Sequence, residues 1–353
     1  MTYLEKINVA IIGCGYIANG HLRSWNKVPD ANVSAVVDLN TELAEKTAET
    51  WKIDNYYGST DELLENEHPD VIDICTPPQV HRALAVQSIK KGINTLIEKP
   101  MTMTVEDSEK ILEAEKQSDV TCGVIHNWLF EPPVPQVRKI VNDGELGEIF
   151  HVDLKALNTR DDWMAKDRNH WCHRLQGGRF GEMLTHPIYL VKEFLGDVKL
   201  ENLHVSKIGP FPWMKSDELV ATLSGGDKYG SFYATFNSPR QAIILNLYGE
   251  KALLSIDMIN GLTSILPPRQ VGKLSVGLDS LRQSSQILAS TLSNVGKVAT
   301  GNWMTGHDLY IQQYAKALQE GTPAPVSIQE GYEVIKILDQ MINELESQEQ
   351  AYK

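Results

Sequence analysis

Short runs of apolar residues alternate with stretches of helical periodicity over the first third of the chain. The apolar runs cover residues 7–12, 33–37, 70–76 and 93–97. Helical patterns follow them at about 18–27, 41–51, 80–91 and 104–117. Continuous apolar runs joined by helices are typical of parallel strands that are buried on both faces. We therefore predict an α/β Rossmann domain, a doubly wound parallel sheet whose strand ends meet along one edge.

The pattern changes after residue 126. Longer strand-like stretches occupy residues 148–158, 217–224, 229–237 and 242–257, which predicts an antiparallel or mixed sheet. We expect helices at 134–142, 182–195, 305–319 and 328–347. Residues 261–304 form an amphipathic, Ser-rich stretch compatible with a helix, and the sequence leaves open whether it is an oligomer arm or a lid. The prediction is two domains, a Rossmann domain at 1–126 and an α+β domain at 127–353.

Composition excludes several classes of protein. The net charge of −13 argues against nucleic acid or an anionic membrane as the main partner. The four cysteines are widely spaced, which favours reduced thiols over a disulfide framework. Residues 1–6 lack the pattern of a signal peptide, and no apolar run approaches the ~20 residues that span a bilayer. We expect a soluble, cytoplasmic protein.

A glycine fingerprint follows the first apolar run. Gly13-x-Gly15-x-x-Ala18 joins a predicted strand to a predicted helix, where a dinucleotide pyrophosphate would bind. The first helical residues, Tyr16 and Ile17, would offer backbone N–H groups to the phosphates. Asp38 ends the next strand, where its carboxylate would accept from both ribose hydroxyls and repel a 2′-phosphate. The expected cofactor is therefore NAD, with NADP disfavoured.

Two further strand ends belong to the same predicted edge. Thr76-Pro77-Pro78-Gln79-Val80-His81 forms a proline-stiffened loop that we expect to lie along the dinucleotide, although His81 is equally interpretable as a plain helix residue. Glu98-Lys99-Pro100 ends the following run. Charged groups at the carboxyl edge of a parallel sheet stand where ligands bind, and a lysine there suits proton exchange. Glu98 is expected to orient Lys99 or to contact the cofactor.

The second half supplies further candidates. Glu182 and His186 are four residues apart, so one continuous helix would place both on one face, with His186 as a base for a substrate hydroxyl. Pro187 would kink that helix or mark a later start. Trp163 and Arg174 lie in a stretch that suits a polar ring ligand, and Asn127 begins the second domain. His170, Cys172 and His173 converge too poorly for a metal site, and we expect no metal.

These motifs in this order resemble the glucose–fructose oxidoreductase / inositol dehydrogenase (Gfo/Idh/MocA) family over nearly the whole chain. The resemblance rests on the glycine fingerprint, Asp38, the Thr76-Pro77-Pro78 loop with His81, Glu98-Lys99-Pro100 and the segment leading to His186, and it extends from His307 to Ser327. It implies a large open sheet in the second domain and homodimers or homotetramers formed through that sheet. It also implies NAD(P)-linked oxidation or reduction of a secondary alcohol.

By resemblance, Lys99 matches the active-site lysine of the family and His186 its second-domain histidine. Three positions differ from the pattern of the family. Glu182 stands where the family usually has Asp, and Tyr189 stands where another Asp is common. Leu184 stands where the family frequently has Gly. The implied substrate contacts come from Lys99, Asn127, Trp163, Arg174, Glu182, His186 and Tyr189. Arg160, Arg168, Arg174 and Arg179 give a mild preference for a charged sugar.

Three functions remain open from the sequence. The first is a dehydrogenase acting on a sugar, an inositol or a sugar derivative. The second is a redox-neutral glycosidase or lyase in which transient oxidation acidifies a neighbouring carbon. The third is an NAD-binding sensor without catalysis, which Lys99 and His186 disfavour because a sensor has no need of a proton-transfer pair.

Overall fold

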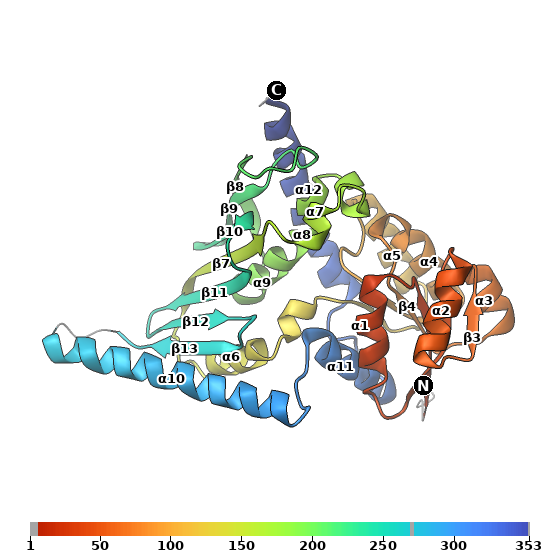
Figure 1. The fold of residues 1–353 in the computed structure, drawn as a ribbon, viewed down its shortest axis with the longest axis horizontal. Helices are drawn as coiled ribbons and strands as arrows, with labels where there is room; N and C mark the ends of the chain where they lie inside the picture. Colours follow the sequence, from red (N-terminus) through yellow and green to blue (C-terminus); the bar gives the residue numbers. More distant parts are fainter. Residues whose placement is uncertain (1–5, 269–271, 352–353) are drawn as a thin grey trace. The chain divides into compact units, whose positions relative to one another are not determined.

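The computed structural model describes residues 6–268 and 272–351, which form two compact units (Figure 1). Of the described residues, the first unit contains 6–130 and 305–339, and the second contains 131–268, 272–304 and 340–351. Residues 305–339 thus pack with the N-terminal half, whereas the sequence placed them in a continuous second domain. The assignment of cofactor binding to 1–126 and of substrate binding to 127–353 stays a prediction.

The first unit is built on a six-stranded sheet in which every pair of neighbouring strands is parallel. The order along the sheet is β3-β2-β1-β4-β5-β6. The strands are β1 (Ile7–Ile12), β2 (Ala31–Val37), β3 (Asn55–Tyr57), β4 (Val71–Ile74), β5 (Asn94–Ile97) and β6 (Cys122–Val124). This order confirms the predicted doubly wound sheet. The two three-residue strands, β3 and β6, are too short to show a period in the sequence and were not predicted.

Helices connect and cover these strands. They are α1 (Tyr16–Trp25), α2 (Thr41–Trp51), α3 (Thr60–Asn66), η1 (Pro78–Val80), α4 (His81–Lys90), α5 (Val105–Lys116), η2 (Asn127–Phe130), α11 (Gly306–Glu320) and the first part of α12 (Ile328–Ala351). Side chains cap several of them: Asn40 accepts from the Leu43 N–H and Thr104 from the Asp107 N–H. The four helices predicted before residue 126 and the one predicted at 305–319 are confirmed within two residues, whereas the helix predicted at 328–347 ends at Ala351. The helices α3, η1 and η2 were not predicted.

The register aligns the strand ends. Ile12 pairs with Val37 on one side and with Ile74 on the other, and Ile74 pairs with Ile97. The residues that directly follow β1, β2, β4 and β5 therefore leave the sheet at one level. The fold collects four loops along one edge in this way.

Helix α11 explains why the chain returns to the first unit. Asp308 accepts hydrogen bonds from the Ser24 hydroxyl and from Lys27 Nζ, both at 2.8 Å. The buried rings of Trp25 and Tyr314 meet edge to face, 6.5 Å between centroids. These contacts join α11 to α1 and to the turn after it, and the sequence alone does not pair these residues.

The second unit contains a seven-stranded sheet in the order β13-β12-β11-β7-β10-β9-β8. Its strands are β7 (Ile149–Thr159), β8 (Lys199–Ser206), β9 (Glu218–Gly225), β10 (Lys228–Ser238), β11 (Ala242–Gly249), β12 (Leu253–Asp257) and β13 (Leu262–Leu266). Only β7 and β10 are parallel neighbours, so the predicted, mainly antiparallel sheet is confirmed. The single strand predicted at 242–257 is wrong, because a turn closed by the Gly249 N–H and the Ala252 carbonyl divides it into β11 and β12.

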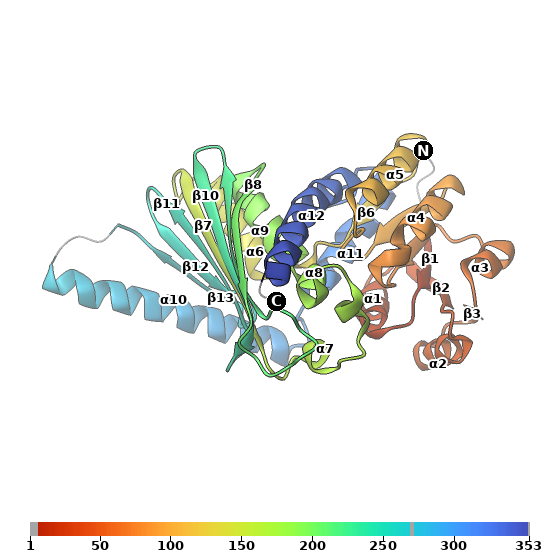
Figure 2. The same cartoon turned by 90° about the horizontal axis from the view of Figure 1, so that it is seen from above.

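The helices of this unit are α6 (Pro133–Asn142), α7 (Trp163–Lys166), η3 (Trp171–Arg174), α8 (Gly178–Met183), α9 (Thr185–Leu195), α10 (Lys273–Ala299) and the end of α12. Figure 2 shows α9 beside β7 and β10, and Gly230 permits this because a Cβ there would lie 2.4 Å from Val191 Cγ1. Within residues 6–268 and 272–351, none of the helices has the length and apolar content of a membrane span.

The helix predicted at 182–195 is wrong at its start. Proline has no N–H to donate to the carbonyl four residues earlier, so Pro187 cannot bond Met183. The structure accordingly ends α8 at Met183 and begins α9 at Thr185, which leaves Pro187 in the first turn of α9, where proline is tolerated. Glu182 and His186 therefore lie on different helices.

Candidate active site

The turn after β1 depends on glycine at position 13. Gly13 has a φ of 96°, and a Cβ added there would lie 2.8 Å from the Cys75 carbonyl oxygen. The Gly13 N–H donates to the Val37 carbonyl at 2.7 Å. A side chain would strain the backbone and separate β1 from the loop after β4. Gly13 thus lets three neighbouring loops pack at the sheet edge.

Gly15 begins α1 with open space beside it. A Cβ at this position would meet no atom within 4 Å, and no side chain caps the helix there, in contrast to α2 and α5. Behind the turn, Ala18 is only 1% exposed, while Tyr16 is 76% exposed and Ile17 is half-buried. The first N–H groups of α1 have no side-chain cap and have open space beside them, so they suit the pyrophosphate of a dinucleotide.

Asp38 holds the glycine turn in place. Its Oδ2 accepts from the Cys14 N–H and its Oδ1 from the Asn40 N–H, both at 2.9 Å. Each carboxylate oxygen has two lone pairs, so both retain capacity for a further donor. Asp38 can therefore support the turn and still accept from a ribose hydroxyl. The sequence predicted the second role and missed the first.

The loop after β4 is tied to the loop after β5 by His81. This side chain is fully buried, with Nε2 2.7 Å from the Thr76 carbonyl and Nδ1 3.0 Å from the Pro100 carbonyl. Burial lowers the pKa of His81, and the carbonyl oxygens at its two nitrogens act in the opposite direction without cancelling that effect. Both nitrogens face the protein, so His81 positions the two loops. Its predicted contact with the cofactor stays a prediction, as does that of the exposed Pro77.

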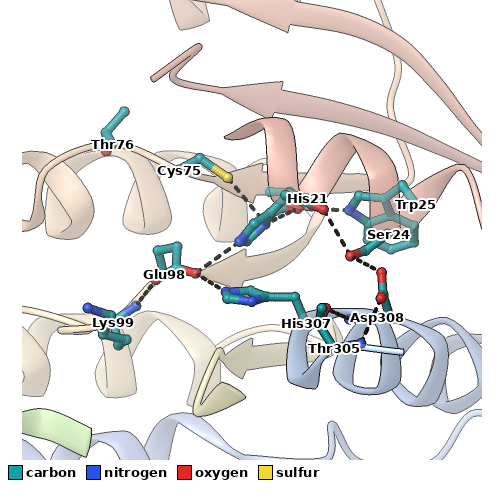
Figure 3. Close-up of polar contacts among 12 residues, drawn as sticks. His21, Ser24, Trp25, Cys75, Thr76, Glu98, Lys99, Thr305, His307 and Asp308 are labelled. Atoms are coloured by element: carbon teal, nitrogen blue, oxygen red, sulfur yellow. Dashed lines mark hydrogen bonds and ion pairs between the residues drawn. The ribbon is translucent and has the colours of Figure 1, made fainter. Parts of the chain in front are cut away.

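Glu98 lies at the centre of a buried polar cluster that also holds the Lys99 backbone (Figure 3). Its Oε2 accepts from the Lys99 N–H at 2.9 Å. Its Oε1 lies 2.9 Å from Nε2 of His21, a fully buried residue of α1, and 3.2 Å from Nε2 of His307 in α11. The opposite nitrogen of His21 lies 2.8 Å from Oδ2 of Asp73, in β4. His21 of α1 and His307 of α11 therefore fix the carboxylate that precedes Lys99, and Asp73 of β4 fixes His21 in turn.

The cluster is an ion-pair network. Both ring nitrogens of His21 face carboxylate oxygens, which accept and cannot donate, so the ring carries both protons. Burial alone would lower the pKa of His21, but Asp73 beside it raises that pKa well above the ordinary value of 6.5. Burial alone would raise the pKa of Glu98, but hydrogen bonds from His21 and His307 hold it well below 4.5. A buried imidazolium thus links two buried carboxylates.

The same atoms have the types that bind metals. One ligand atom from each of His21, Glu98 and His307 lies within 4.8 Å of the others. The hydrogen-bond geometry already accounts for this proximity, since His21 donates on both sides. In the second unit, His170 Nδ1 accepts from the Cys172 N–H at 3.3 Å and His173 Nε2 lies 2.9 Å from the Met164 carbonyl. These contacts assign local structural roles to the residues weighed in the sequence as a metal site.

His21, Asp73 and His307 were not predicted as site residues. One signal was available, because Asp73 interrupts an apolar run whose neighbours are all buried. A carboxylate in such a strand requires a partner. The sequence does not show which partner, since His21 lies 52 residues earlier in the chain.

The second unit brings His186 and Tyr189 together on α9. His186 Nδ1 lies 2.6 Å from the Tyr189 hydroxyl, and both side chains are buried. Tyr189 thus provides a neutral partner where the resemblance implied that a carboxylate is common.

Glu182 forms an ion pair with Arg179 within α8. Arg179 is only 6% exposed, and it also pairs with Asp162 at 3.3 Å. Burial alone would lower the pKa of Arg179, but Glu182 and Asp162 raise it. Two carboxylates therefore more than balance the single positive charge of Arg179, which weakens the argument from arginines for a charged sugar.

The remaining predicted residues of this unit are more exposed. Trp163 is 47% exposed and meets the ring of His170 edge to face, with 5.0 Å between centroids. Arg174 ends η3 and is exposed. An exposed aromatic ring and an exposed guanidinium are available for a polar ligand.

Three buried side-chain atoms have no hydrogen-bond partner in the described part of the chain: Thr76 Oγ1, Asn127 Oδ1 and Thr185 Oγ1. Thr76 and Asn127 are predicted site residues of the first unit, and Thr185 precedes His186 in the second. Buried polar atoms in native proteins are nearly always paired, so unpaired ones indicate a missing ligand or water. Two of the three atoms belong to residues that the sequence singled out, and Thr185 was not among the predicted site residues.

The first unit brings Gly13, Asp38, Thr76 and Lys99 to one sheet edge, and Asn127 follows its last strand. The second unit gathers His186 with Tyr189, and Glu182 with Arg179. That Lys99 and His186 act on one substrate stays a prediction.

Comparison with known proteins agrees with this arrangement. Residues 7–126 match the oxidoreductase family with an NAD-binding Rossmann fold, and residues 134–255 match the GFO/IDH/MocA C-terminal domain. Over 239 residues the chain is 24% identical to the levoglucosan dehydrogenase of Pseudarthrobacter phenanthrenivorans, an alignment that covers 64% of this chain and 60% of the relative. Over 262 residues it is 27% identical to the 2,7-anhydro-N-acetylneuraminate hydratase of Escherichia coli, covering 71% and 68%.

Among solved structures, the WlbA dehydrogenase of Bordetella pertussis in complex with NADH and UDP-GlcNAcA superimposes with a TM-score of 0.80. The two sequences are 18% identical, and the match covers 98% of this chain and 97% of the other. At that identity the similarity shows the fold. The sequence alignments are shorter, and the chain spans between 40% and 62% of the length of four curated relatives.

Proposed function

This chain belongs to the Gfo/Idh/MocA family of oxidoreductases, and on that premise we propose that it oxidises or reduces a secondary alcohol of a sugar, an inositol or a sugar derivative. The observation that carries the proposal is the register of the first sheet. Ile12, Ile74 and Ile97 are aligned, so the glycine turn, Thr76 and Glu98-Lys99 follow three neighbouring parallel strands. A nucleotide-binding turn and a lysine at one edge suit redox chemistry with a proton transfer.

The cofactor we assign is NAD, with NADP disfavoured. Gly13, Gly15, Tyr16 and Ile17 would hold the pyrophosphate, and Asp38 would accept from the ribose hydroxyls. The Thr76 hydroxyl, which is buried and unpaired, suits a polar group of the same ligand. When bound, the nicotinamide accepts a hydride from the alcohol or, reduced, returns it to the ketone.

Lys99 is the residue we assign to the substrate oxygen. Glu98 accepts the Lys99 N–H and is itself fixed by His21 and His307, so the backbone at the lysine is anchored to a carboxylate that two histidines hold in place. A lysine ammonium there would hydrogen-bond the alcohol oxygen and exchange its proton as the oxidation state changes.

His186 is the second proton carrier of the proposal. The Tyr189 hydroxyl contacts Nδ1 of His186, and we assign Nε2 of the same ring to the substrate. Because tyrosine is neutral, it orients the ring without adding the negative charge that a carboxylate would supply. Glu182 would act through Arg179 or on a substrate hydroxyl.

Asn127, Trp163 and Arg174 complete the proposed substrate contacts. The unpaired Oδ1 of Asn127 would accept from a sugar hydroxyl, and the exposed ring of Trp163 would stack on an apolar sugar face. We assign a cytoplasmic location to the protein, and a homodimer or homotetramer formed through the second sheet.

The test is a panel of sugars, inositols and sugar acids incubated with NAD and, in parallel, with NADP, with reduced nucleotide followed by its absorbance. NADH formation with at least one secondary alcohol, lost in Lys99→Ala, supports the proposal. A panel in which turnover is equal in wild type and Lys99→Ala overturns the role of the lysine.

A redox-neutral reaction is the second candidate, and similarity to the Escherichia coli hydratase favours it. Transient oxidation at one carbon would acidify its neighbour and allow elimination or hydration, after which the hydride returns. The distinguishing measurement is product formation by mass spectrometry without accumulation of NADH. An equimolar yield of NADH and ketone excludes this candidate.

A further inference from the structure

Helix α10 carries a row of exposed apolar side chains. The residues recur at intervals of three and four along the helix, and they are Leu278, Leu281, Ser285, Leu288, Leu292, Val295 and Ala299, named here the α10 seam. This is the heptad spacing of positions a and d in a coiled coil, with one serine among the apolar residues. The stretch that the sequence left unassigned at 261–304 thus contains three heptads of a helix-pairing pattern.

The opposite side of α10 is docked on its own sheet, as Figure 1 shows for α10 and β13. The Gln286 side chain accepts from the Ile265 N–H at 2.7 Å and donates to the Ile265 carbonyl at 3.2 Å. Asn294 Nδ2 donates to the Asn260 and Gly261 carbonyls at 2.9 and 3.0 Å. These amide contacts, eight residues apart, fix the rotation of the helix. The seam is therefore directed away from the sheet by a specific interaction.

The α10 seam exposes apolar side chains to water, which is unfavourable in free energy. Leu281 is 69% exposed, Leu292 63%, and Leu278, Leu288 and Val295 are 58–60% exposed. Covering the seam and flanking valines on two copies would remove an apolar area on the order of 1,000 Å² from water, the lower bound of a specific interface. An apolar strip of this length marks an interaction surface.

We propose that the α10 seam packs against the α10 seam of a second copy of this chain. An apolar row with a/d spacing packs well against another row with the same spacing. A second copy of this chain carries an identical row, so a suitable partner is always present. Residues 283–296 contain no charged side chain, so two copies can approach along the seam without like-charge repulsion despite the net charge of −13. This contact is separate from the pairing through the second sheet and from the proposed activity.

Charge also argues against a membrane as the occupant. Interfacial helices carry lysine and arginine on the face opposite their apolar side. On α10 that opposite face holds Gln286, which is bonded to β13, and Asn294, which is bonded to the turn before β13. Neither side chain is available to lipid. The helix contributes few cations within a strongly acidic chain. The chemistry of the seam fits another helix of its own kind.

The first experiment compares a seam variant, Leu281→Glu with Leu288→Glu, with a control carrying the same charges off the seam, Ser280→Glu with Ser293→Glu. All four residues are exposed, so both variants should fold, as thermal melting by circular dichroism would show. Sedimentation equilibrium over a range of concentrations gives the mass. The proposal predicts a mass about two-fold lower for the seam variant than for wild type and the control.

Chemical cross-linking through an introduced cysteine tests the proposal without a mass measurement by sedimentation. The native cysteines Cys14, Cys75, Cys122 and Cys172 are buried, so Leu288→Cys provides the reactive thiol for a short bis-maleimide. We expect covalent dimers from Leu288→Cys and none from Ser293→Cys. An equal mass for wild type and the seam variant, or monomeric wild type that binds anionic vesicles, overturns the proposal.

Discussion

Nε2 of His21 lies 2.9 Å from Oε1 of Glu98, inside the first unit. His21 is on the helix that begins at the glycine turn, and Glu98 accepts the backbone N–H of Lys99 with its other oxygen. One ion pair therefore joins the element expected to hold the cofactor phosphates to the element expected to carry the proton. Neither residue needs to touch substrate to affect the reaction.

Removing the histidine should destabilise the protein strongly. His21→Asn leaves Asp73 and Glu98 buried without their shared cation, and breaking a buried pair costs about 3–5 kcal/mol. We expect the free energy of unfolding in urea to fall by that amount. His68→Asn, at an exposed histidine, is the control and should change it by less than about 0.5 kcal/mol.

The His21–Glu98 coupling can be isolated by a double-mutant cycle. Glu98→Gln combined with His21→Asn should cost less than the sum of the two single changes, because each already breaks the pair. Additive free energies would contradict a direct interaction between the two side chains.

The contribution of this network should depend on pH in both directions. The pKa of Glu98 is held below 4.5, so its contribution is present above that value and is lost as pH falls through the lowered pKa. The pKa of His21 is raised above 6.5, so its contribution is complete below 6.5 and is lost as pH rises through the raised pKa. Urea unfolding of wild type and His21→Asn across pH should show the largest difference between pH 4.5 and 6.5, and a difference that grows outside that window would refute the assignment.

Lys99→Ala should separate chemistry from cofactor binding. Loss of a positioned proton carrier lowers turnover about 10²- to 10⁴-fold. NADH affinity should stay within a few-fold of wild type, because the glycine turn and Asp38 are untouched. Lys90→Ala, an exposed lysine of α4, is the matched control and should retain full turnover.

Tyr189→Phe tests the partner of His186. The change removes the hydroxyl 2.6 Å from Nδ1 and leaves a buried ring nitrogen without that contact, at a cost of about 1–3 kcal/mol. We expect lower stability together with a lower kcat, since the ring loses its orientation. The control is Tyr229→Phe, at a tyrosine that is 57% exposed, and equal kcat values in the two variants would argue against His186 as a proton carrier.

Sequence reasoning succeeded where the signal is local. The run at 7–12 followed by Gly13 predicted β1 and its turn correctly. A strand buried on both faces requires consecutive apolar residues, and a positive φ favours glycine, so both features can be recognised in the local sequence. The same holds for Glu98 and Lys99, which directly follow β5.

It failed where distant segments meet. Nothing near Asp308 indicates that α11 packs on α1, because Ser24 and Lys27 lie more than 280 residues away. The Glu182–His186 face was wrong for a different reason. Four-residue spacing places two side chains on one face only of a continuous helix, and Pro187, which cannot donate the backbone hydrogen bond, marks the later start that the sequence had left open.

The most direct test of the central claim is a titration of the purified protein with NADH and, separately, with NADPH, followed by energy transfer from its tryptophans. The glycine turn and Asp38 predict saturable binding of NADH and markedly weaker binding of NADPH, with the NADH signal reduced in Asp38→Ala. Binding of neither nucleotide would contradict the dehydrogenase account, and tighter binding of NADPH would contradict the role of Asp38.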